Sequence, residues 1–154
     1  MSKWIDYLLE KPFFYDNIRA AITFGVRYSP IRKALNASSE DTIIDFGSGT
    51  GTYSKIFHKT KNEYTGVEIS RQYYDTACAR HNFSNIHFIH SDFFTLEKLE
   101  DKSFDLALMT GVLHHLTDED CIRILTIINR VTRKRLIIQD LAPSRFHFIS
   151  NFLM

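Results

Sequence analysis

Several features that would place this chain in a special class are missing. It has no uninterrupted run of about 18 apolar residues, which argues against a membrane-spanning helix. Asp6 interrupts any signal-peptide core at the start, so we expect no export. The only cysteines, Cys78 and Cys121, have neither CxxC nor zinc-type spacing. With 19 basic against 18 acidic residues, the net charge of +1 argues against a nucleic-acid wrapper. These absences predict a reduced, cytoplasmic globular protein without membrane contact.

Glycine and proline are also scarce. Three of the six glycines fall within residues 47–51, whereas the three prolines leave residues 31–142 free of proline. Glycine is needed where a chain turns tightly or where a ligand approaches the backbone. The segment 47–51 is therefore the first candidate for a functional loop, inside a long region that favours unbroken strands and helices.

Apolar periodicity predicts an α/β fold. Short apolar runs that suit buried strands alternate with segments of helical spacing, and this alternation is typical of a parallel sheet covered on both faces. We predict one Rossmann-like, doubly wound, mostly parallel domain over residues 1–154. The expected strands are 42–46, 64–69, 86–90, 104–109 and 135–139, and the expected helices are 52–59, 70–82 and 118–131. Around a core at 41–141 we expect an aromatic-rich helical lid at 1–40 and a short helix at 142–154.

The loop after the first predicted strand lies where open parallel sheets bind ligands. Its pattern is GxGxG, because Thr52 occupies the position of the third glycine in a dinucleotide fingerprint, which disfavours an NAD-dependent oxidoreductase. Glu68, 23 residues after Asp45, is placed to accept the hydroxyls of an adenosine ribose. Asp92 and Phe93 follow the third strand and could meet an adenine, although Asp92 is equally suited to cap a helix.

Four segments, in order, resemble a known family. Residues 43–51, 64–70, 91–93 and 103–116 are similar to the glycine motif, the acidic second-strand motif, the adenine-contacting segment and the fourth-strand signature of class I S-adenosylmethionine-dependent methyltransferases. The resemblance extends from about residue 40 to residue 141. It implies S-adenosylmethionine as the cofactor and methyl transfer as the activity, and we expect a small-molecule acceptor.

The resemblance also implies roles for individual residues. The methionine moiety would lie on the glycine loop, the ribose on Glu68, the adenine on Ile69 with Asp92 and Phe93 at its edge, and the sulfonium beside the end of the fourth strand. The implied cofactor-binding residues are Asp45, Gly47, Ser48, Gly49, Thr50, Gly51, Glu68, Ile69, Asp92, Phe93, Thr110 and Gly111.

Catalysis of methyl transfer needs a base only if the acceptor must lose a proton. His114 and His115, just after the fourth strand, are the nearest titratable candidates, with pocket wall as their alternative role. We expect no metal, because His87 and His90 have an odd spacing that sends their side chains to opposite faces of a strand.

The end of the chain leaves a second function open. Related methyltransferases continue with two more strands, here expected to be absent, so the chain could instead be a cofactor-binding fragment or an inactive partner subunit. The apolar edge at residues 135–141 would then favour self-association or a partner chain. The basic run 130–135 could suggest nucleic-acid contact, but we expect a solvated turn at the end of the sheet opposite the site.

Overall fold

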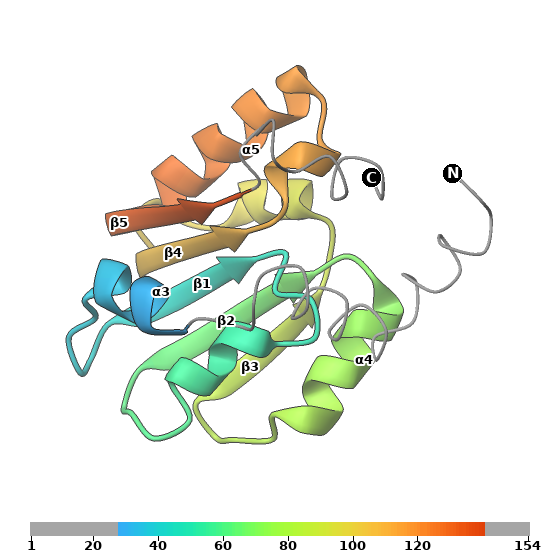
Figure 1. Cartoon of the computed structure of the whole chain (residues 1–154). Coiled ribbons are helices and arrows are strands. Elements are labelled where there is room, and N and C mark those ends of the chain that lie inside the picture. The colour runs from blue at the N-terminus through green and yellow to red at the C-terminus, as the bar shows by residue number, and fades with distance from the viewer. Residues whose placement is uncertain (1–27, 141–154) are drawn as a thin grey trace, which may run out of the picture. The chain divides into compact units, whose positions relative to one another are not determined.

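Five parallel strands form the sheet of the computed structural model, which describes residues 28–140 (Figure 1). The strand order is β3-β2-β1-β4-β5. The chain therefore moves outward from β1 to β3 and then returns to the other side of β1 for β4. The order reverses between β1 and β4, which is where open α/β sheets bind their ligands. The strands are β1 (Thr42–Phe46), β2 (Glu63–Glu68), β3 (Ile86–His90), β4 (Phe104–Thr110) and β5 (Thr132–Gln139).

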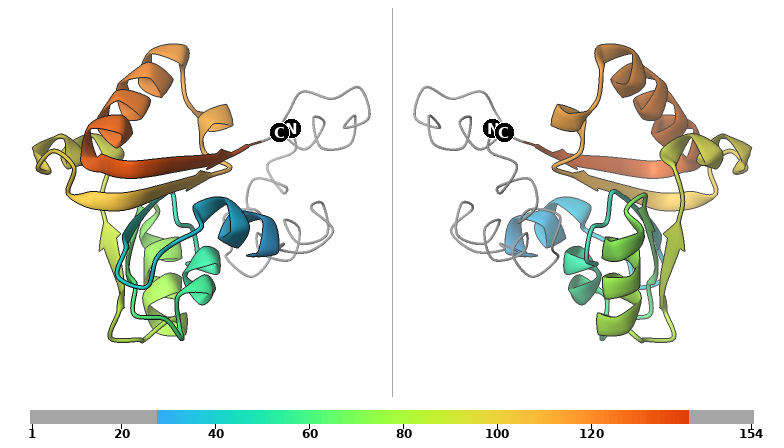
Figure 2. Two further views of the ribbon diagram at one scale, coloured as in Figure 1. Left: turned by 90° about the vertical axis from the view of Figure 1, so that its left-hand side faces the viewer. Right: turned by 90° about the vertical axis from the view of Figure 1, so that its right-hand side faces the viewer.

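Helices cover both faces of this sheet, as Figure 2 shows. One face carries α5 (Asp118–Val131) and the 3-10 helix η2 (Phe93–Lys98), and the other carries α3 (Tyr28–Leu35), α4 (Arg71–Arg80) and the 3-10 helix η1 (Thr52–Ile56). A last 3-10 turn, η3 (Leu113–His115), follows β4. The predicted Rossmann-like, doubly wound α/β fold is thus confirmed. None of the helices within residues 28–140 is long and apolar enough to cross a membrane.

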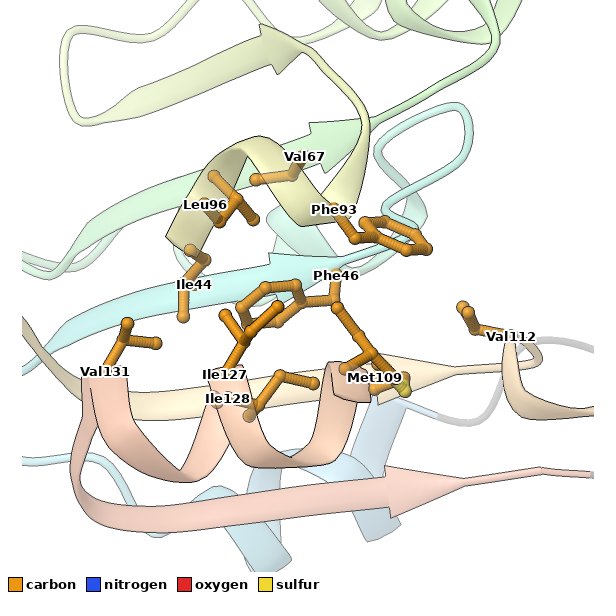
Figure 3. Packing of buried hydrophobic residues seen from close by; sticks show 12 residues of the cluster. Ile44, Phe46, Val67, Phe93, Leu96, Met109, Val112, Ile127, Ile128 and Val131 are labelled. Atoms are coloured by element: carbon orange, nitrogen blue, oxygen red, sulfur yellow. The ribbon is translucent and has the colours of Figure 1, made fainter. Parts of the chain in front are cut away.

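A hydrophobic core cluster lies between the sheet, α5 and η2 (Figure 3). Ile124, Ile127, Ile128 and Val131 share the buried face of α5, as the helical spacing predicts. Thr117 caps this helix by accepting the N–H of Asp120, and an acidic first turn suits the positive end of the helix dipole. The cluster holds the carboxyl ends of β1 and β4 in place, through Phe46 and Met109 among others, and so positions the loops that follow them.

Two predicted elements differ from the structure. Residues 52–59 were expected to form an α-helix, but only the short η1 forms there; Gly51 occupies its N-cap position and provides no side-chain cap. The fifth strand begins at Thr132 and not at residue 135, because α5 leads directly into it.

Arg130 therefore belongs to the last turn of α5 and residues 132–135 belong to β5, so the basic run is not a turn, although it does lie at the end of the sheet opposite the glycine loop. Arg133 donates to Asp105 at 2.7 Å, and Lys134 donates to Asp41 at 2.5 Å. Arg135 donates to two backbone carbonyl groups at the end of α3, at 2.9 and 3.0 Å. These side chains join α3, β4 and β5 within the domain, so the run is explained by structural pairing and not by a nucleic-acid surface.

The boundary predictions are only partly covered by the described residues. Residues 28–140 form one compact unit. Of the predicted lid at 1–40, the described part is α3 and the segment after it, and α3 buries Ile31 and Leu35. The rest of the lid and the predicted helix at 142–154 lie outside the described residues.

Candidate cofactor site

The glycine loop, residues 47–51, follows β1 and bends over the end of β2. The N–H groups of Gly47 and Ser48 both donate to the carbonyl of Val67, at 2.9 and 3.1 Å. Gly47 has a φ of +73°, and a Cβ there would lie 2.4 Å from Cγ2 of Val112, which follows β4. Only glycine allows this left-handed conformation and this close approach together. The loop therefore packs closely against the residue after β4, at the switch point of the sheet, where the strand order reverses between β1 and β4.

The other two glycines of the loop have different tasks. A Cβ at Gly51 would lie 2.7 Å from both the His81 ring and the Phe88 ring, so this glycine allows close internal packing. A Cβ at Gly49 would meet no heavy atom of residues 28–140 within 4 Å. Gly49 is itself buried, but among the three glycines of the loop it is the one with free space beside its Cα.

Glu68, at the end of β2, is held by the loop. Its two carboxylate oxygens accept the N–H groups of Gly49 and Ser70, each at 2.8 Å, and the side chain is buried. Ser70 also caps α4, as predicted from the sequence. An ionised carboxylate has about four lone-pair sites, so Glu68 retains capacity to accept hydroxyl groups. It is adjacent to Gly49, the glycine of the loop with free space beside its Cα.

The polar side chains around the loop point inward. Asp45 is fully buried and accepts the hydroxyl of Tyr64 at 2.6 Å. Burial, together with the Asp45 charge, raises the pKa of Tyr64 well above its ordinary value, so the phenol remains a donor. Ser48 and Thr50 are buried as well. Asp45, at the end of β1, is thus joined to β2 through Tyr64.

The predicted adenine contacts divide into three cases. Ile69 is 59% exposed directly after Glu68, so its side chain is accessible. Asp92 accepts the N–H of Phe94 at 2.9 Å and is the N-cap of η2, which was its alternative role. Phe93 is only 9% exposed and packs edge-on against Phe46, with ring centroids 6.2 Å apart (Figure 3). Its ring belongs to the core cluster.

Thr110 and Gly111 end β4 on the other side of the switch point. Thr110 is buried, and the N–H of Gly111 donates to Gln139 at the end of β5 at 2.8 Å. A Cβ at Gly111 would lie 3.8 Å from Cε1 of His114. The imidazole of His114 therefore lies next to Gly111, the residue expected to border the sulfonium.

Asp140 was not predicted, yet it organises this side of the site. One of its carboxylate oxygens lies 2.6 Å from Nδ1 of His114, and the other accepts the N–H of Leu113 at 2.7 Å. The ring centroids of His114 and His115 lie 3.9 Å apart. Burial and the neighbouring His114 lower the pKa of His115. The available signal for Asp140 was its place directly after β5, since parallel strands bring their carboxyl ends to one edge.

No group of three His, Cys, Asp or Glu side chains that could hold a metal ion is found within residues 28–140. What the described site offers is a glycine loop with one open position, a carboxylate beside it, and an imidazole across the switch point. The class that these observations define is a doubly wound α/β domain whose candidate site lies at the switch point of the sheet.

Comparison with known families agrees with this class and narrows it. The methyltransferase domain family matches residues 43–135, more than half of the chain. The chain belongs to this family, and its fold is that of the class I S-adenosylmethionine-dependent methyltransferases that the sequence motifs resemble. No curated protein sequence matches the chain.

Solved structures share this fold at low sequence identity. YcgJ from Bacillus subtilis superposes with a TM-score of 0.65 and 19% identity, covering 82% of this chain and 55% of that one. Phosphoethanolamine N-methyltransferase 1 from Haemonchus contortus, in complex with phosphoethanolamine and S-adenosylhomocysteine, superposes with a TM-score of 0.65 and 18% identity. The match covers 76% of this chain and 26% of that one. A putative S-adenosylmethionine-dependent methyltransferase from Methanococcus maripaludis superposes with a TM-score of 0.60 and 20% identity, covering 72% of this chain and 52% of that one. The chain thus spans from about a quarter to just over half of the length of these proteins.

Proposed function

We propose that this domain binds S-adenosylmethionine at the glycine loop and transfers its methyl group to a small-molecule acceptor. The observation that carries the proposal is the free space beside the Cα of Gly49, whose N–H donates to the buried carboxylate of Glu68. An adenosine cofactor needs such a pair: bare backbone for close approach and an ionised acceptor for two ribose hydroxyls. Membership of the methyltransferase domain family supports the choice of cofactor.

We assign each part of the cofactor to particular residues of the site. Glu68 would accept the ribose hydroxyls, the exposed Ile69 would pack on the adenine, and Gly49 would lie against the methionine moiety. Thr110 and Gly111 would border the sulfonium from the end of β4. When bound, the cofactor supplies an electrophilic methyl group, so the protein has to align the acceptor and exclude water. Because Asp45 and Phe93 are buried, we assign them to supporting the loop and the core.

For an acceptor that must lose a proton, His114 is the stronger of the two histidine candidates. Asp140 accepts from Nδ1, at 2.6 Å, which leaves the lone pair of Nε2 to take a proton. The ring also lies beside Gly111, where the methyl group would be transferred. Burial and the neighbouring His114 lower the pKa of His115, so we propose it as the wall of the acceptor site.

Calorimetry with S-adenosylmethionine, S-adenosylhomocysteine and NAD tests the cofactor. We expect heat of binding with the first two and none with NAD. A folded protein that gives no heat and no thermal shift with either adenosyl compound would refute the proposal, and binding of NAD alone would favour the oxidoreductase alternative.

A screen of amines, phenols, thiols and carboxylic acids, with S-adenosylhomocysteine release as the signal, tests the transfer step and the base. With any acceptor found, we expect His114→Asn and Asp140→Asn to lower kcat about 100-fold while cofactor affinity is unchanged, in line with general-base contributions. His87→Gln, on the outer strand β3, is the matched control, since His87 contacts Glu63 and not the site. Full turnover in His114→Asn would leave no base role for this residue.

A second candidate function is that of a cofactor-binding partner subunit that needs another chain. The observation behind it is that β5, within residues 28–140, pairs only with β4, and that Ile138 on it is 43% exposed. An open strand edge of this kind favours pairing with another chain. We propose self-association through β5 in a cytoplasmic, reducing environment, in keeping with the two free thiols. Light scattering at micromolar concentration checks this, and a clean monomer would contradict it.

A further inference from the structure

A histidine outside the predicted site is attached to the back of the glycine loop. His81 follows α4, where its N–H donates to the carbonyl of Ala77 at 3.0 Å and closes the helix. Its Nε2 lies 3.2 Å from the carbonyl oxygen of Thr50, in the middle of the loop, and the ring is only 4% exposed. None of the roles proposed above uses this residue.

The geometry determines which nitrogen carries the proton. The Thr50 carbonyl can only accept, so Nε2 of His81 must donate. Nδ1 is buried with no hydrogen-bond partner among residues 28–140, so a proton there would be an unpaired buried donor. The ring is therefore assigned as the neutral tautomer with hydrogen on Nε2.

The surroundings keep the ring neutral. Burial lowers the pKa of His81 to about 4, and the nearby His58, Lys55 and Arg80 act in the same direction, whereas the bond to Thr50 opposes them. His58 lies with its ring centroid 5.1 Å from that of His81 and has a lowered pKa as well. At neutral pH the loop is thus held by an uncharged donor.

Packing and hydrogen bonding act together on the loop. The His81 ring occupies the space that a Cβ of Gly51 would need, at 2.7 Å, so the ring fits against the bare backbone. On the opposite side of Thr50, the N–H of Gly49 is bonded to Glu68. Glu68, before α4, and His81, after α4, therefore bind nearby peptide groups of the loop and restrain its conformation.

We propose that His81 is a positioning residue that fastens the glycine loop in the conformation required for cofactor binding. The inference rests on the proposed binding of S-adenosylmethionine. A loop that is already ordered loses less conformational entropy when the ligand arrives, so the fastening raises affinity without any contact between His81 and the ligand.

The first test compares variants of His81 by calorimetry with S-adenosylhomocysteine. His81→Leu fills the space without a donor, and we expect affinity to fall about five- to tenfold, as for the loss of one buried neutral hydrogen bond. His81→Gln keeps an N–H donor and should stay within about threefold of the wild type. His87→Leu, on the exposed side of β3, is the matched control and should leave affinity unchanged. Equal affinities for His81→Leu and the wild type would overturn the inference.

The second test uses the wild-type protein without any ligand. Long-range nitrogen–proton NMR spectra should show the Nε2–H tautomer of His81 at neutral pH, and amide exchange at Gly51 should be faster in the folded His81→Leu variant than in the wild type or in His81→Gln. A wild-type Nδ1–H tautomer or a charged ring would overturn the inference even if a variant does not fold. Absence of S-adenosylhomocysteine binding by the wild type would refute the cofactor assignment, while these spectra would still decide whether His81 fastens the loop.

Discussion

Asp105, at the amino end of β4, provides the sharpest quantitative prediction. Its carboxylate accepts the N–H and the hydroxyl of Thr42, at 3.1 and 3.2 Å, and the Arg133 guanidinium, at 2.7 Å, with the Lys134 ammonium 3.3 Å away. Burial by itself would raise the pKa of Asp105, but the hydrogen bonds from Thr42, Arg133 and Lys134 outweigh it and lower the pKa from 3.8 to about 2. The change we propose is Asp105→Asn, which removes the charge and keeps the shape.

The magnitude follows from this shift. A depression from 3.8 to about 2 corresponds to about 2 kcal/mol of stabilisation of the folded state, at roughly 1.4 kcal/mol per pKa unit. Because the pKa is lower in the folded state, this stability is present above pH 3.8 and is lost as the pH falls through the folded value. Asp105→Asn should therefore lower the free energy of unfolding by about 2 kcal/mol at pH 7 and by about half of that at pH 3.

Urea denaturation at pH 7, 5 and 3 measures the effect. Asp101→Asn is the matched control, since Asp101 pairs with Arg130 at 2.6 Å but its side chain is 73% exposed. Exposed pairs contribute about 0–1 kcal/mol, so this variant should change little at any pH. A loss in Asp105→Asn that is the same at pH 7 and pH 3, or no larger than that of the control, would refute the reasoning.

Two further predictions concern the site. Gly47→Ala should lower the free energy of unfolding by about 2 kcal/mol or more, since its Cβ would lie 2.4 Å from Val112 at a φ of +73°, whereas Gly49→Ala, with open space at its Cβ, should cost only about 1 kcal/mol. Urea denaturation compares the two, and equal losses would contradict the assignment of Gly47 as the packed position. Glu68→Gln should weaken S-adenosylhomocysteine binding about 10- to 100-fold, because charge-assisted hydrogen bonds contribute about 1.5–3 kcal/mol, and an unchanged dissociation constant in calorimetry would exclude the ribose role.

Much of the fold could be predicted from local patterns. Alternating apolar runs and helical spacings located all five strands and the amphipathic α5, because a strand buried on both faces and a one-sided helix have different periods. Ser70 could also be predicted as the cap of α4, because an N-cap depends only on residues within one helical turn. The short η1 and the early start of β5 were missed, because element boundaries depend on the neighbouring loop and on pairing with distant residues.

The sequence by itself determined that this chain would form a parallel α/β sheet with a glycine loop at its switch point and an acid at the end of β2. Those features depend on backbone preference and on spacing along the chain. The tertiary structure alone decided what the side chains do: Asp45 and Phe93 are buried, Asp140 pairs with His114, and His81 holds Thr50. The physical reason is that the two hydrogen-bonded pairs join residues 26 and 31 positions apart. A local sequence pattern cannot predict such pairs, because only the folded chain brings the partners together.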